Sequence, residues 1–216
     1  MSIKLGTLGI KPPYSKVYLG NLLKYQASGG NFVETEFTTG IFPTNWTEIT
    51  TAEYTSTDLY GEWKIWANRY TASQWAKFYI IYAFDGDSST KWHGGVSSTS
   101  GNAEMGIILP TNTAIKFTKA TLTSKSGVYG ADLYGKNETT GEWELLWDGG
   151  SNTTTTTITN AGDTYYTEFK FIFSYTGTST NSYVDEFQVN EGVIKHIFYW
   201  WMNNKNKSHR GIVWKL

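Results

Sequence analysis

The chain has 216 residues with a net charge of −1, and charged residues make up only 17% of it. This balance creates no electrostatic field that would attract nucleic acid, so we expect no nucleic-acid partner. Aromatic residues reach 17% alongside 22 glycines and no cysteine, which favours β-structure with many turns, excludes disulfide bonds and is compatible with assembly in a cytosol.

The N-terminal stretch MSIKLGTLGIKPPYS lacks the apolar centre of a secretory signal. No run in the sequence approaches the roughly 18 apolar residues that a membrane-spanning helix needs. We therefore expect no membrane partner. At this length the chain can form one sizeable core, alone or with appendages.

Residues 1–45 are predicted to form an N-terminal attachment segment. Within it, KVYLGNLLKY at Lys16–Tyr25 has two short apolar runs around Gly20-Asn21, a pair that tolerates the positive φ of a tight turn. This pattern predicts a β-hairpin. The phrase resembles short hairpins near the ends of bacteriophage virion proteins, and the resemblance implies a virion component. An ordinary hairpin is the alternative that the residues leave open.

Residues 46–191 are predicted to form one β module. Its clearest strand is Glu168–Tyr175, where Phe169, Phe171 and Phe173 alternate with mostly polar residues and are expected to face the core. About eight short strands without a long helix predict an antiparallel sandwich or jelly roll. Further strands are expected at 62–70, with Trp63 and Ile65 opposite Lys64 and Trp66, at 104–110, 114–123, 128–134 and 183–190, and at 142–147, with Trp143, Leu145 and Trp147 on one face.

The loop Tyr82–Trp92, YAFDGDSSTKW, is the stretch richest in chemistry. Asp85-Gly86-Asp87 is a turn signal, because glycine accepts positive φ and aspartate bonds its own backbone. With the Thr90 hydroxyl and nearby carbonyls, these carboxylates could form an oxygen cage for calcium. A solvated turn closed by hydrogen bonds alone, with Asp85 capping backbone amides, is the alternative.

The same loop resembles the signature of the discoidin family, also called coagulation-factor C-type domains, which includes galactose-binding-like carbohydrate-binding modules. The matching residues are Ala83, Phe84, Asp85, Gly86, Asp87, Thr90 and Trp92. Similar companions follow: GIILP at 106–110, Gly141, Trp143 and Leu146 in a hairpin, and YYTEFKFIF leading to VDEFQV. Glu104-Met105 departs from the family, which usually has tryptophan there. The resemblance covers about two-thirds of the chain.

The resemblance implies an all-β, galactose-binding-like jelly-roll sandwich whose loops bind ligand at one end. It implies a structural calcium ion held by Asp85, Asp87, Thr90 and Glu186. It also implies a sugar contact at His93, for which an exposed loop residue is the alternative. Possible partners of His93 in carbohydrate binding are Arg69, Trp66 and Tyr129.

Residues 192–216 are predicted to form a C-terminal aromatic and basic extension. HIFYWW at 196–201 precedes a stretch with no acidic residue. A nucleic-acid arm or an interfacial membrane anchor are alternatives, but two apolar runs around NNKNKSHRG favour a strand pair that packs on the module or on a neighbouring subunit.

No motif predicts catalysis. The carboxylates form no convincing pair, and His93, His196 and His209 lack metal-site spacing. We therefore expect a non-catalytic virion protein of decoration, tail or fibre type, assembled in a host cytoplasm as a multi-copy or homo-oligomeric component with other virion proteins. Its discoidin-like module would bind cell-surface glycans. The alternatives are an accessory carbohydrate-binding module of a glycan-degrading system and a purely structural virion protein without ligand.

Overall fold

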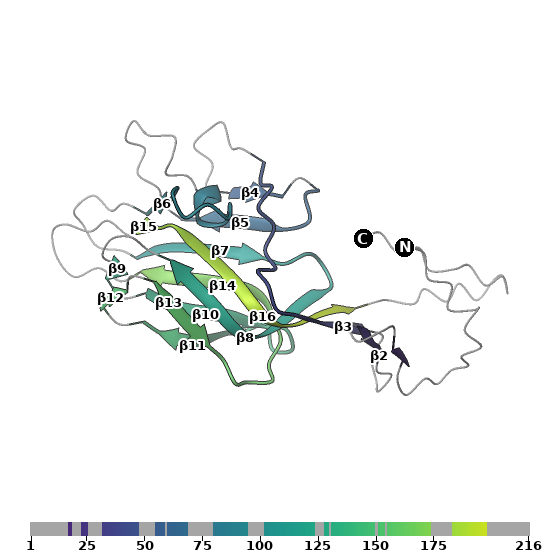
Figure 1. Ribbon diagram of the computed structural model, residues 1–216. Helices are drawn as coiled ribbons and strands as arrows, with labels where there is room; N and C mark the ends of the chain where they lie inside the picture. Colours follow the sequence, from purple (N-terminus) through teal and green to yellow (C-terminus); the bar gives the residue numbers. More distant parts are fainter. Residues whose placement is uncertain are drawn as a thin grey trace.

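The alternation of apolar and polar residues gives an almost entirely β-structure in the computed structural model (Figure 1). The structure describes residues 17–18, 23–25, 32–47, 55–58, 60–68, 80–94, 102–123, 128–129, 131–149, 151–153, 155–173 and 183–197. Within these ranges, no helix is long and apolar enough to cross a membrane.

Two long strands organise the sheet. β8 (Thr113–Thr123) and β16 (Glu186–Ile197) have 11 and 12 residues and pair antiparallel along most of their length. One 3₁₀ turn, η3, covers Ile80–Ala83. The shorter strands are β1 (Val17–Tyr18), β2 (Leu23–Tyr25), β3 (Phe32–Phe37), β4 (Thr55–Thr57), β5 (Lys64–Ala67), β6 (Trp92–His93), β7 (Ala103–Ile108), β9 (Val128–Tyr129), β10 (Ala131–Asn137), β11 (Trp143–Asp148), β12 (Ser151–Thr153), β13 (Thr156–Thr159), β14 (Tyr166–Phe173) and β15 (Tyr183–Val184).

The strands form two layers around the core. One layer runs in the order β13, β8, β16, β3, β2, β1, and the other in the order β11, β10, β14, β7, β5, β4. β8 and β14 join the layers where Ile115 lies opposite Tyr166. Two small sheets pair β12 with β9 and β15 with β6. The predicted all-β fold, an antiparallel sandwich, is confirmed.

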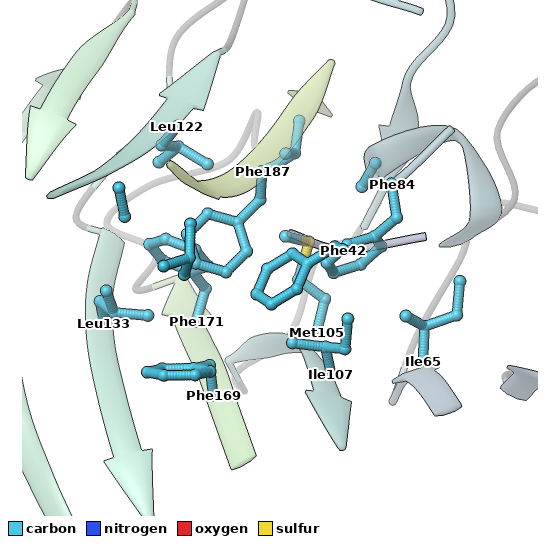
Figure 2. Close-up of a cluster of buried hydrophobic side chains, with 14 of the residues drawn as sticks. Phe42, Ile65, Phe84, Met105, Ile107, Leu122, Leu133, Phe169, Phe171 and Phe187 are labelled. Atoms are coloured by element: carbon cyan, nitrogen blue, oxygen red, sulfur yellow. The ribbon is translucent and has the colours of Figure 1, made fainter. Parts of the chain in front are cut away.

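The core is rich in phenylalanine (Figure 2). The alternating Phe169, Phe171 and Phe173 of β14 are at most 1% exposed, which confirms the prediction for this strand. Phe171 meets Phe187 of β16 edge to face, with ring centroids 4.8 Å apart. Such a contact stabilises by roughly 0.5–1.5 kcal/mol beyond the burial of the rings.

Strands on both sides of the predicted central module pair with one another and with it. β3 pairs with residues 192–197 of β16, and β16 runs through position 191 as one strand, although its pairing with β8 shifts register on both sides of Glu191. Phe42 is 4% exposed and packs on Phe187 at 5.5 Å. Residues 32–45 and 192–197 therefore belong to the same sheet and core as the central module. The remainder of the C-terminal extension, 198–216, lies outside the described residues.

The N-terminal hairpin is confirmed in its pairing. Val17 lies opposite Tyr25 and Tyr18 opposite Lys24, and β2 then adds to β3. The turn at Gly20-Asn21 is outside the described residues. In Figure 1, β16 and β3 run out of the sandwich together toward β2.

The predicted common face of Trp143, Leu145 and Trp147 is wrong. A bulge in the β10–β11 pairing sets Trp147 opposite the buried Leu133 but Leu145 opposite Tyr134. Because one extra residue reverses the side on which following side chains point, Trp147 packs against the core while Leu145 is 53% exposed.

Candidate functional site

The loop after η3 is anchored by buried aromatic rings. Phe84 and Trp92, which flank it, are both fully buried, and the indole N–H of Trp46 donates to the Phe84 carbonyl at 2.9 Å. Gly86 has φ +78°, and a Cβ there would also lie 3.0 Å from Thr44 Cγ2. The chain therefore turns sharply at a position that favours glycine.

Hydrogen bonds close the loop from inside. The Asp87 N–H donates to Asp85 Oδ1 at 2.9 Å, and the Thr90 hydroxyl lies 2.8 Å from Asp85 Oδ2 and 2.8 Å from the Asp87 carbonyl. Asp87 in turn accepts the N–H of Ser89 at 2.8 Å. Burial raises the pKa of Asp85, against the lowering effect of the bonds from Asp87 and Thr90. Asp85 thus performs the amide-capping role that the alternative reading assigns to it.

Glu186 reaches this loop from the start of β16. Its Oε2 accepts the Gly86 N–H at 2.9 Å across 100 positions of sequence. Its Oε1 is buried and has no hydrogen-bond partner among the described residues. Burial is the main cause that raises the pKa of Glu186 to about 8, and the charges of Asp85 and Asp87 add to the effect. The structure therefore brings the four predicted cation ligands together.

The oxygen atoms at this site are of the kinds that calcium binds, but the acidic side chains are not closely grouped. Carboxylate, hydroxyl and carbonyl oxygens are the ligands that calcium prefers, and the Glu186 carboxylate has a buried Oε1, with the Gln188 side chain near the carboxylate. Among the described residues, however, no three aspartate, glutamate or histidine side chains gather closely enough to hold a metal by themselves. A cation here would need backbone carbonyls, such as that of Asp87, and solvent to complete its shell.

Asp185 is an acidic residue of this region that the sequence reasoning missed. It is fully buried, and its backbone N–H donates to the Thr123 carbonyl at 2.9 Å. The signal was present in VDEF, because two acidic residues between the core residues Val184 and Phe187 break the alternation of a regular strand.

His93 is a buried strand residue. It is 6% exposed and pairs with Tyr183 across β6 and β15, with the two rings stacked at a centroid distance of 4.2 Å and an angle of 18°. The Lys91 ammonium lies 4.3 Å from the centre of the same Tyr183 ring. The alternative of an exposed loop histidine is therefore wrong. The aromatic partner of His93 came from a segment 90 positions away, so local spacing gave no sign of it.

Of the other predicted sugar contacts, Trp66 lies on the outer face of β5, and the side chains of Tyr129 and Arg69 are not among those that the structure describes. Trp66 alternates with the buried Ile65 and Ala67, so it points away from the core, and its indole covers Gly106. Tyr129 is described only through its backbone in β9, and Arg69 is outside the described residues. The structure does not show these residues as one cluster with His93.

Comparisons with known proteins identify the fold. No protein-family model and no curated protein matches the chain. Among solved structures, a fucosidase from Ruminococcus gnavus in complex with fucose is similar at 14% identity and a TM-score of 0.50, over 61% of this chain and 25% of that one. The match spans a quarter of the fucosidase, and at this identity it establishes the fold alone.

Two further similar structures are separate modules. The C-terminal domain of a chitobiase from Bacteroides fragilis has 17% identity and a TM-score of 0.49, over 61% of this chain and 95% of that one. A family 32 carbohydrate-binding module from Clostridium perfringens, in complex with galactose, has 18% identity and a TM-score of 0.46, over 61% and 93%. None of these comparisons points to a bacteriophage.

Proposed function

We propose that this chain is a non-catalytic glycan-binding module that binds sugar where β6 meets β15. The observation that carries the proposal is the contact of Tyr183 with both the His93 imidazole and the Lys91 ammonium. His93 and Lys91 occupy the two faces of the Tyr183 ring, so the groups that remain for a sugar are the Tyr183 hydroxyl and the Lys91 ammonium, which can donate to sugar hydroxyls. The discoidin-like sequence of the adjoining loop and the fold it shares with the fucosidase support the same function.

Within this proposal, Tyr183 is the principal sugar contact and His93 positions it. Tyr183 is half-buried, and its phenol, whose pKa burial raises further above its ordinary value of 10, can donate a hydrogen bond near pH 7. His93 is nearly covered, so its ring fixes the orientation of Tyr183 through stacking.

We further propose that calcium stabilises this end of the module. The two segments that carry the sugar cluster, 91–93 and 183, continue directly into the predicted ligands at Thr90 and near Glu186. A cation between Glu186 and the Asp85 loop would therefore hold the two segments together. When bound, calcium would supply charge neutralisation for Glu186, Asp85 and Asp87, and no reaction step depends on it.

The virion remains our proposed setting, with other virion proteins as partners. It is supported by the hairpin phrase KVYLGNLLKY and by the way β1, β2 and β3 extend the sheet along β16. Mass spectrometry of purified phage particles tests this setting separately from sugar binding. Detection of the chain only with secreted glycan-degrading enzymes would favour the accessory-module alternative instead.

The test of the sugar site is calorimetric titration of sugar into the wild type, Tyr183→Ala and Tyr60→Ala, each in a buffer that contains calcium. Tyr60 is a matched control, because it is 77% exposed and lies in the turn between β4 and β5. We expect a wild-type dissociation constant of roughly 10 μM to 1 mM, a loss of at least tenfold in Tyr183→Ala and no change in Tyr60→Ala. Equal affinities for all three proteins would remove β6 and β15 from the binding site.

A further inference from the structure

The outer face of the second layer carries aromatic residues in a regular arrangement. Strand register defines one row across this face, in which Trp66, Gly106, Lys170, Tyr134 and Leu145 are successive neighbours. A second row, beside it, contains Lys64, Ile108, Glu168, Lys136 and Trp143. We call these two rows the outer platform.

Two indole rings lie along the platform from opposite flanks. A Cβ on Gly106 would come within 2.8 Å of the Trp66 ring, so this indole extends from β5 over β7. The Lys170 ammonium, on β14, lies 4.6 Å from the centre of the Trp143 ring, although Trp143 is two strands away on β11. Because neighbouring strands are about 4.8 Å apart, the Trp143 indole extends from β11 over β10 toward Lys170 on β14.

Two of the three lysines of the platform pair with glutamates, one of them the neighbouring Glu104, and the third lysine, Lys64, lies at the edge of the platform on β5. Lys170 lies 3.8 Å from Glu104, and Lys136 forms an ion pair with Glu168 at 2.7 Å. These side chains are between 17% and 35% exposed, so they are held on the surface and accessible to a ligand. A surface that has paired its own charges gains little from a charged ligand, whereas its fixed ammonium and carboxylate groups can still bond hydroxyls.

The residue composition of the outer platform differs from that of a protein–protein interface. The centres of such interfaces are depleted in lysine and glutamate. Here Lys170 stands between the indoles, and the Trp143 ring receives two lysine ammonium groups, from Lys170 at 4.6 Å and Lys136 at 5.8 Å. Aromatic faces with interleaved, satisfied polar groups match the C–H faces and hydroxyls of a sugar better than an apolar protein patch.

A cavity adjoins one end of the platform. It has a volume of about 240 Å³, and Ile108 and Glu168 of the second row contribute to its wall. Its other lining residues include Thr111, Asn112, Thr113 and Glu138. A chain of sugars lying on the platform could therefore extend into this cavity.

We propose that the outer platform is a second ligand surface, which binds a neutral oligosaccharide or polysaccharide chain across Trp66 and Trp143. This surface lies on a sheet face, apart from the loop cluster of His93 and Tyr183, and it does not depend on that cluster. The ligand class follows from the pairing of Lys170 and Lys136 with carboxylates, which disfavours a charged ligand there, and from the two indoles that extend over the same outer face.

The test is affinity electrophoresis of the full chain through gels that contain a soluble β-glucan, galactan, mannan, xylan or polyuronate. We expect at least one neutral polymer to retard the wild type, with no retardation by the polyuronate. Trp143→Ala and Trp66→Ala should each weaken retardation at least tenfold, whereas Tyr60→Ala should match the wild type. Melting curves establish that each variant is folded, and Trp143→Phe, which keeps an aromatic face, should restore part of the binding.

The loop variant Tyr183→Ala distinguishes this inference from the proposed function. Polymer binding that survives Tyr183→Ala but not Trp143→Ala supports the platform. Binding that survives Trp143→Ala and Trp66→Ala in folded protein overturns the platform, whatever the loop cluster does. Retardation by the polyuronate alone, or by no polymer, also overturns it, as does a wild-type dimer in sedimentation that Trp143→Ala dissociates.

Discussion

Replacing Glu186 by Gln removes a partly buried, titratable carboxyl group while keeping the size of the side chain. In the metal-free protein, burial and then the neighbouring aspartates raise the pKa of Glu186 from 4.5 to about 8. A raised carboxyl pKa means that the folded state holds its proton more tightly than the unfolded state. Stability from this group is therefore complete below about pH 4.5, falls as pH rises, and has reached its minimum above pH 8.

The size of the effect follows from the same pKa. Each tenfold change in proton affinity corresponds to about 1.4 kcal/mol, so the full change sets an upper bound of about 5 kcal/mol. Because Glu186 is partly accessible to solvent, we expect about 1–2 kcal/mol. At pH 9 without metal, Glu186→Gln should therefore melt about 2–8 °C above the wild type, and the two should converge near pH 5.

With calcium bound, the wild type should instead melt at a higher temperature than Glu186→Gln. At a hundredfold excess over its dissociation constant, a bound ion stabilises the wild type by about 2.7 kcal/mol, and Glu186→Gln should lose most of that gain. Magnesium should substitute poorly because it demands a tighter octahedral shell.

The assay is circular-dichroism melting at pH 5, 7 and 9, with chelator and then with calcium. Glu191→Gln on the same strand serves as control, since Glu191 pairs with Lys119 and its side chain is 43% exposed. If the melting temperatures of the wild type and Glu186→Gln depend on pH in the same way, folding does not raise the pKa of Glu186. If calcium stabilises both equally, Glu186 is not a ligand.

Three further outcomes are expected. Phe171→Ala should lower the free energy of unfolding by about 3–5 kcal/mol, measured by urea denaturation, because the ring is 1% exposed; a loss below 1 kcal/mol would contradict its place in the core. His93→Ala should weaken sugar binding and also lower the melting temperature, since the imidazole is buried against Tyr183, and an unchanged melting temperature would argue against that stacking. Purified protein should release no sugar from oligosaccharides, and turnover that disappears when one carboxylate is replaced would refute the non-catalytic role.

The parts of the fold that were predictable are those that depend on local alternation. Phe169, Phe171 and Phe173 sit two residues apart, so a single strand determines which face they occupy. The bulge opposite Leu133 has no comparable local signal, because it depends on how β10 and β11 pair. A one-residue slip was enough to invalidate the predicted face of Leu145.

The candidate site was predictable only in part, because it also depends on pairing between segments that are distant in the sequence. The Asp85 loop is contiguous, and its turn chemistry can be read from Asp-Gly-Asp. Its connection to Glu186 came from family resemblance and not from spacing. The stacking of His93 on Tyr183 depends on pairing between β6 and β15, which no property of either segment alone reveals.

The most direct test of sugar binding is a glycan array probed with the full chain in calcium, free of any fusion partner that itself binds sugar. Binding to at least one neutral glycan, competed by the same free glycan and reduced by chelator, is the predicted result. A folded, calcium-saturated chain that binds no glycan on the array, and none of the polysaccharides in gels, would contradict the central claim that this sandwich is a glycan-binding module.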